Sequence, residues 1–243
     1  MTSLIAALSN FQNDYCDIKT DRINGKSNVF IEHLSITQFR LIYSLFSLTL
    51  LFLCLIDTPN FTSSLFLLGC WLILILYNLI LQKWVIIGNI VVVLCSLLSF
   101  LLPFIATETP IEKLSVNLQF LLVYTFISIA LIQFVRELIK DVIDLKGDYN
   151  SNYKTLAIVL GSARVLYLCM TLLMIYAVIT LYFLYWYPNS FNYTWFAIAL
   201  GVLPLTLNIV WDLHRTNPSI ELNSKKLKVL IALGLLSLLI YQT

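Results

Sequence analysis

Six aspartates fall into two short runs that share one spacing pattern. They are Asp14, Asp17, Asp21, Asp141, Asp144 and Asp148. In a helix, residues three, four and seven positions apart lie on one face, so each run predicts a row of three carboxylates. Carboxylates in a row repel one another, most strongly where a bilayer limits their hydration. A cation is therefore expected between them. Mg²⁺ carrying a diphosphate fits, because this ion prefers a few carboxylates together with phosphate oxygens.

The rest of the chain is strongly apolar. Its 243 residues are 60% hydrophobic and 12% charged, with a formal net charge of +2. Apolar stretches of about 20 residues recur along the sequence, and a helix of that length crosses a bilayer. The alternation of apolar and polar residues that is typical of β-barrel strands is absent. The sequence therefore predicts an all-α, polytopic membrane bundle formed by a single domain over residues 1–243.

Seven full spans are expected after a shorter N-terminal helix. The spans cover residues 36–56, 61–82, 84–106, 115–138, 156–186, 191–211 and 226–242. The helix over residues 2–24 has an apolar part, Leu4–Phe11, that is too short to cross a hydrocarbon core of roughly 30 Å. We expect this helix either to end a longer span or to insert only partway.

The connections between the spans differ in charge. Of the 15 lysine and arginine residues, only Lys113 falls on one side of the expected membrane. By the positive-inside rule the other side, which carries both aspartate runs, faces the cytoplasm. We therefore expect a multi-pass protein of the inner cell membrane with its acidic runs on the cytoplasmic face.

Three segments carry motifs in a recognisable order. Residues 13–21 read NDYCDIKTD, residues 77–89 read YNLILQKWVIIGN, and residues 136–148 read RELIKDVIDLKGD. These resemble three signatures of the UbiA-type intramembrane prenyltransferases: NDxxDxxxD, Y(S/N)…LKR…GN, and a DxxDxxxD motif in the context REIxKDIxDxxGD. In the form of the last motif, the sequence is most similar to members that alkylate a glycerol-phosphate ether lipid.

The resemblance implies a reaction and its partners. In that family an isoprenyl diphosphate binds through Mg²⁺ held by the two aspartate runs, in a central cavity of the helical bundle that is open to lipid. The polyprenyl group then passes to a small acceptor within the membrane. For this chain the implied acceptor is a glycerol-phosphate ether lipid or a quinone-type aromatic precursor. The implied partners are the diphosphate, the acceptor and the lipid bilayer, with no nucleic acid.

The resemblance also gives the candidate residues their roles. All six aspartates are expected metal ligands, with Asp17 and Asp144 as the catalytic pair. Nearby basic and amide side chains are candidates for binding the diphosphate, namely Asn13, Arg22, Lys83, Arg136, Lys140 and Lys154. Asn89 is expected to orient ligands or water. Gly147 is expected to break the helix after Asp144 and turn Asp148 inward.

Departures from the family pattern leave other functions open. Members commonly have nine spans, and by that count this sequence lacks the family's first span. Residues 25–31 differ from the family's RPxRPIPSG segment, and Gln82 replaces the first basic residue of LKR. A catalytically inactive truncated paralogue and a cation-coupled membrane transporter are therefore alternatives. The acids lie at helix ends rather than mid-membrane, which favours the enzyme.

Some charged groups are expected to have structural roles instead. Asp212 and Arg215 end an expected span, and they predict an ion pair or a helix stop. For Lys83, Lys140 and Lys154, anchoring at the cytoplasmic membrane surface competes with a role in diphosphate binding.

Overall fold

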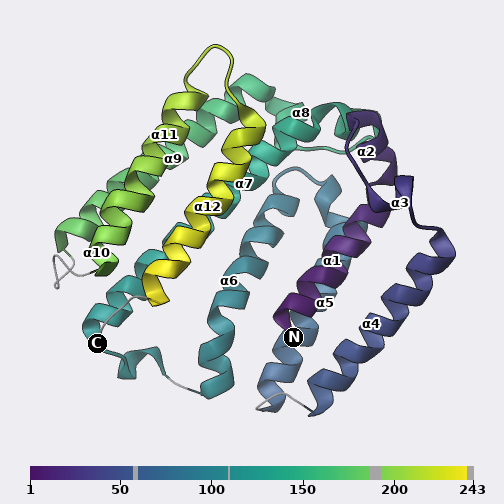
Figure 1. Ribbon diagram of the computed structural model, residues 1–243, viewed down its shortest axis with the longest axis horizontal. Helices are drawn as coiled ribbons and strands as arrows, with labels where there is room; N and C mark the ends of the chain where they lie inside the picture. The colour runs from purple at the N-terminus through teal and green to yellow at the C-terminus, as the bar shows by residue number, and fades with distance from the viewer. Residues whose placement is uncertain (57–59, 109, 187–192, 240–243) are drawn as a thin grey trace. The chain divides into compact units, whose positions relative to one another are not determined.

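A computed structural model describes residues 1–56, 60–108, 110–186 and 193–239 of the chain. Every regular element in these ranges is helical (Figure 1), which confirms the all-α prediction. The chain divides into two compact units. The first unit comprises Met1–Thr109 and Asp144–Val159, and the second comprises Pro110–Ile143 and Leu160–Thr243. The single membrane domain and its central cavity stay predictions.

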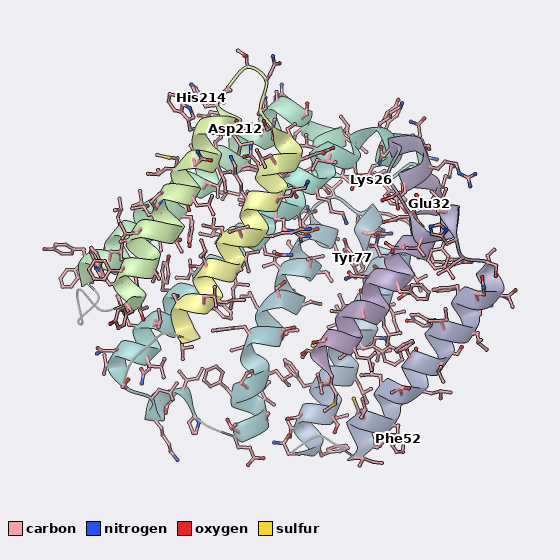
Figure 2. All side chains as sticks on the ribbon, viewed as in Figure 1. Lys26, Glu32, Phe52, Tyr77, Asp212 and His214 are labelled. Atoms are coloured by element: carbon pink, nitrogen blue, oxygen red, sulfur yellow. The ribbon has the colours of Figure 1, made fainter. Side chains whose placement is uncertain are left out.

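Six stretches of helix in the described ranges are long and apolar enough to cross a membrane. They are α4 (Ile36–Ile56), α5 (Phe61–Leu79), α6 (Ile87–Thr107), α7 (Val116–Asn150), α9 (Ser162–Trp186) and Tyr193–Leu213. The last consists of α10 (Tyr193–Ala197), a π-helical turn (Ile198–Val202) and α11 (Leu203–Leu213). Large apolar side chains on these helices are exposed, such as Phe52, which points outward from α4 (Figure 2).

The expected count of seven spans is not confirmed. Expected span 226–242 falls on α12, Ile220–Leu239, which is not among the six. Its first half carries several charged residues, namely Glu221, Lys225, Lys226 and Lys228. Residues 191–192 and 240–242, at the ends of two expected spans, lie outside the described ranges.

The N-terminal helix is part of the first unit's core. It is divided at Asp17 into α1 (Thr2–Cys16) and α2 (Ile18–Asn24), and α3 (Val29–Glu32) follows. Helix α1 lies beside α4 and α5 (Figure 1). Its buried residues pack against Leu50 of α4 and Leu67 of α5. Because lipid tails are as apolar as these side chains, close van der Waals packing rather than the hydrophobic effect holds α1 in place.

One expected span is two helices. The apolar run over residues 156–186 is divided into α8 (Leu156–Leu160) and α9, with Gly161 between them at φ +86°. A residue without a Cβ adopts this left-handed conformation at little cost, so the chain turns there. The prediction of one helix was wrong because the apolar runs before and after Gly161 are separated by only a few residues and were read as continuous.

Gly147 does not break its helix, so that prediction was wrong. Helix α7 continues to Asn150. Instead, the glycine lets another segment approach α7: a Cβ at this position would lie 2.7 Å from the Thr20 carbonyl oxygen and 2.4 Å from Asn24 Nδ2. The Gly147 N–H donates to Asn24 Oδ1 at 2.8 Å. Because Gly147 has no side chain, α2 packs directly on the C-terminal end of α7.

The second unit has its own buried contacts. The Tyr124 hydroxyl on α7 lies 3.1 Å from that of Tyr176 on α9, and 3.2 Å from Thr180 Oγ1. The Asp212 carboxylate accepts hydrogen bonds from the N–H of Ser219 and from Asn223 Nδ2, and it lies 3.7 Å from Arg215. Figure 2 shows Asp212 and His214 at the end of α11. The structural role predicted for Asp212 is confirmed.

Candidate functional site

The first aspartate run surrounds the junction of α1 and α2. Asp17 ends α1 with φ −94° and ψ 9°, and it also begins α2. Two neutral amides donate to its carboxylate: Asn13 Nδ2 at 2.5 Å and Gln82 Nε2 at 3.3 Å. Asn13, a predicted diphosphate ligand, therefore holds Asp17 in this structure. Hydrogen bonds from amides fix a carboxylate without neutralising its charge, as around a metal ligand.

Asn28 fixes the other end of this run. Its buried side chain donates through Nδ2 to Asp21 Oδ2 at 2.7 Å and to the Asp14 carbonyl oxygen at 2.8 Å. Its Oδ1 accepts from the N–H of Phe30 at 3.0 Å and so caps α3. One amide therefore ties the aspartates to the segment that follows them.

Replacing Asn28 should loosen this segment. We expect Asn28→Ala to lower the free energy of unfolding by about 2 kcal/mol, because it removes a helix cap and leaves buried partners unsatisfied. Thermal unfolding in detergent, followed by circular dichroism, measures the change. Ser27→Ala, at the exposed neighbouring position, is the matched control. Equal melting temperatures for the two variants would contradict the assigned role.

Lys26, five residues after the first aspartate run, connects that segment to the second run. The Lys26 ammonium forms an ion pair with Asp144 Oδ1, and the Asp144 side chain is 14% exposed. Figure 2 shows Lys26 close to α2 and α3. Asn24 Nδ2 also donates to the Asp144 carbonyl oxygen, at 3.4 Å. Residues that follow the first run thus hold both the side chain and the backbone of Asp144.

The loop after α7 is fixed to the turn before α6. The N–H of Tyr153 donates to the Asp148 carbonyl oxygen at 2.9 Å, and the N–H of Lys154 donates to the Lys83 carbonyl oxygen at 2.9 Å. Lys83 Nζ lies 5.7 Å from the centroid of the Tyr153 ring. The two segments line an open pocket of about 520 Å³, whose lining residues are Lys83, Trp84, Val85, Asn152 and Lys154.

Tyr153 is a neighbour of both aspartate runs. Burial raises the pKa of its phenol, and the negative charges of Asp17 and Asp148 raise it further, while the Gln82 amide opposes them. The phenol is therefore a neutral group at physiological pH, with one carboxylate from each run beside it. The charges of both runs therefore act on one side chain within the first unit.

The turn before α6 is strained. Ile86 has φ +65° and ψ −36°, an unfavourable conformation for a β-branched residue, and Ile87 N–H donates to the Val85 carbonyl oxygen at 2.7 Å. Two residues later, a Cβ on Gly88 would lie 3.0 Å from Gln82 Cα. The first turn of α6 thus packs directly on the segment that carries Gln82 and Lys83. Such outliers occur at functional sites, where surrounding contacts hold them.

The structure brings most of the predicted site residues into the first unit. These are Asp14, Asp17, Asp21, Asp144, Asp148, Asn13, Arg22, Lys83, Asn89 and Lys154. Asn89 is buried on α6, whereas Arg22 on α2 is exposed. Asp148 is also buried, with 8% of its surface exposed.

The remaining predicted residues belong to the second unit. They are Arg136, Lys140 and Asp141, all on α7. Arg136 Nη1 lies 2.6 Å from Oε1 of the buried Glu137, so its charge has a partner there. In the described part of the chain, no three His, Cys, Asp or Glu side chains gather closely enough to hold a metal ion. The metal-binding roles therefore stay predictions.

Sequence reasoning missed several residues of this site, namely Asn24, Lys26, Asn28, Gln82 and Tyr153. Lys26 and Asn28 lie in the segment that departs from the family pattern, and Gln82 is itself a departure. Each of these three contacts an aspartate of the motifs. Departures close to acidic motifs were therefore the available signal.

Comparison with known proteins identifies the family of the chain. Residues 1–240 match the sequence model of the UbiA prenyltransferase family. The chain belongs to the UbiA prenyltransferase family. Prenyl transfer, predicted from the motifs, is confirmed at the level of this family, whose members are enzymes. The six apolar spans and the family together make the chain a multi-pass membrane protein.

Individual relatives are similar in sequence or in fold. A digeranylgeranylglyceryl phosphate synthase of Methanosphaera stadtmanae is 26% identical over 203 residues, covering 82% of this chain and 67% of the relative. One of Pyrococcus abyssi is 30% identical over 153 residues, covering 63% of this chain and about half (51%) of the relative. A solved structure from work on digeranylgeranylglyceryl phosphate synthase in membranes is similar with a TM-score of 0.64 and 22% identity. The similarity covers 97% of this chain and 80% of that one. It confirms the membrane-helical fold.

Proposed function

We propose that this UbiA-family chain transfers a polyprenyl group from an isoprenyl diphosphate to a small acceptor within the membrane. The observation that carries the proposal is the approach of the two aspartate runs. The charges of Asp17 and Asp148 both raise the pKa of Tyr153, and Lys26 joins the segment after the first run to Asp144. A membrane protein has no structural need to place acids from distant segments together, since each costs free energy to desolvate.

The donor groups of the site fit Mg²⁺. They are carboxylate oxygens, which this hard cation prefers, and it commonly takes only one or two of them and completes its shell with water and substrate phosphates. A site without a closed cage of three acids is therefore consistent with Mg²⁺. We propose all six aspartates as its ligands. They are Asp14, Asp17 and Asp21 of the first run and Asp141, Asp144 and Asp148 on α7. When bound, Mg²⁺ would neutralise the diphosphate as the leaving group.

The chain's own residues bind and orient the substrate in this proposal. Lys83 and Lys154 line one pocket beside the acidic runs, and their ammonium groups would bind phosphate oxygens. Arg22, Arg136 and Lys140 stay further candidates for this role. Asn13, Gln82 and Asn28 hold carboxylates through neutral amides, so the negative charge remains available to a cation. Lys26 neutralises Asp144 directly, and we propose that it turns to the diphosphate when the substrate binds.

For the acceptor we propose a glycerol-phosphate ether lipid. Both curated relatives are digeranylgeranylglyceryl phosphate synthases, which favours this acceptor over a quinone-type aromatic precursor. We also propose that the site faces the cytoplasm from the inner cell membrane, because the span order expected from the sequence puts all basic residues but Lys113 on the side of the aspartate runs.

The test is release of pyrophosphate by the purified full chain in lipid vesicles. We expect release from geranylgeranyl diphosphate only with Mg²⁺ and a prenylglycerol phosphate acceptor both present, and EDTA should abolish it. Vesicles that offer an aromatic quinone precursor instead should give little release. Release that persists in excess EDTA, or no release with either acceptor, would contradict the proposal.

A further inference from the structure

Tyr153 lies at the meeting point of three separate segments. Its N–H is bonded to Asp148 at the end of α7, and its ring lies under the Lys83 ammonium from the turn before α6. The amide of Gln82, which also donates to Asp17 on the first run, lies beside its hydroxyl. No sequence motif of the family assigns this residue a role.

We propose that Tyr153 is a positioning residue that holds the Lys83 ammonium beside the two aspartate runs, ready to bind a diphosphate. Lys83 is exposed and its side chain is flexible, so without a partner the ammonium would sample many positions. The aromatic face attracts the ammonium and limits these positions. The Lys154 N–H, bonded to the Lys83 carbonyl oxygen, keeps the backbones of the two segments in register.

The strained turn supports this inference. Ile86, with its positive φ, redirects the chain three residues after Lys83, and Gly88 allows α6 to pack on Gln82. The backbone that carries Lys83 is therefore fixed by its own contacts, while the lysine side chain is fixed by Tyr153. Both are needed to place one ammonium group accurately.

A double-mutant cycle tests the inference, which rests on the proposed function. Binding of magnesium pyrophosphate to the full chain in detergent is measured by titration calorimetry. We expect Tyr153→Leu to weaken binding about fivefold, which corresponds to one exposed cation–π contact. Lys83→Gln should weaken binding at least as much. The double variant should bind no more weakly than Lys83→Gln alone, because Tyr153 acts through that lysine.

Two further variants separate positioning from a merely structural role. Tyr153→Phe keeps the aromatic face and should bind nearly as the wild type does. Tyr149→Leu changes an exposed tyrosine in the last turn of α7, four residues before Tyr153, and is the matched control that should bind as the wild type does. In turnover assays Tyr153→Leu should raise KM for the diphosphate and leave kcat nearly unchanged.

The outcomes distinguish the two proposals. Additive losses from Tyr153→Leu and Lys83→Gln, or a Phe variant as weak as the Leu variant, would overturn the inference while the proposed function stands. Equal binding by the wild type and Tyr153→Leu would overturn it in the same way. A wild-type chain that does not bind magnesium pyrophosphate overturns both.

Discussion

Asp17→Asn should reduce pyrophosphate release at least about 1000-fold, a loss typical of removing a main electrostatic contact in an active site. Asparagine keeps the shape of the side chain and one acceptor oxygen, so a hydrogen bond from Asn13 or Gln82 can persist. It removes the negative charge that a cation needs. The expected result is therefore a folded chain that neither binds magnesium pyrophosphate nor turns over geranylgeranyl diphosphate.

Glu32→Gln is the matched control for this change. Glu32 is an exposed acid on α3, close in sequence to the first run (Figure 2) and outside the proposed machinery. This variant should release pyrophosphate at the wild-type rate. Melting curves of both variants show whether the fold persists. Wild-type turnover by a folded Asp17→Asn chain would exclude Asp17 from the catalytic role.

Gly147→Ala should lower the free energy of unfolding by about 3 kcal/mol or more, the upper range for overpacked sites. The new methyl group would lie 2.7 Å from the Thr20 carbonyl oxygen, a backbone atom that cannot move without shifting α2. The same change would disturb the bond between Asn24 and Gly147, and with it the attachment of the segment after the first run to the second run. Thermal unfolding in detergent measures the effect, and activity should fall in parallel.

Gly69→Ala is the control for helix propensity. Gly69 is in α5 of the same unit, and nothing lies within 4 Å of a Cβ added there. Alanine favours helix over glycine by about 1 kcal/mol, so this variant should be as stable as the wild type or slightly more stable. If the two alanine variants have the same melting temperature, the close approach at Gly147 is not what holds α2 to α7.

The helices were largely predictable from the length of apolar runs. The expected span 36–56 coincides with α4, because both its ends are marked by polar residues. The break at Gly161 was not predicted, since a single glycine is also compatible with a continuous helix. Spacing alone predicted a row of carboxylates in each run, but the first run lies across the break between α1 and α2 at Asp17. That the two runs serve one site was implied by the family resemblance, and the charges of Asp17 and Asp148 both act on Tyr153.

The partners of the acids could not be predicted in the same way. Lys26 and Asn28 reach Asp144 and Asp21 because Gly25, at φ +67°, reverses the chain after α2. Which residues then meet depends on packing between distant segments, which spacing along one helix does not encode. Gly147 shows the same limit. The sequence shows that a glycine lies there, but whether it bends α7 or lets another helix pack closely on α7 depends on the position of α2.

The contact of Lys26 with Asp144 joins residues 118 positions apart, and that of Asn24 with Gly147 joins residues 123 positions apart. A ribosome working at about 5–20 residues per second needs roughly 6–24 s to synthesise such an interval. Helices α4, α5 and α6 must all leave the ribosome before the second aspartate run is synthesised. The contacts that join the two acidic runs can therefore form only after the fourth apolar helix has been synthesised, whereas Asn13 and Asn28 can bond Asp17 and Asp21 as soon as the first 28 residues exist.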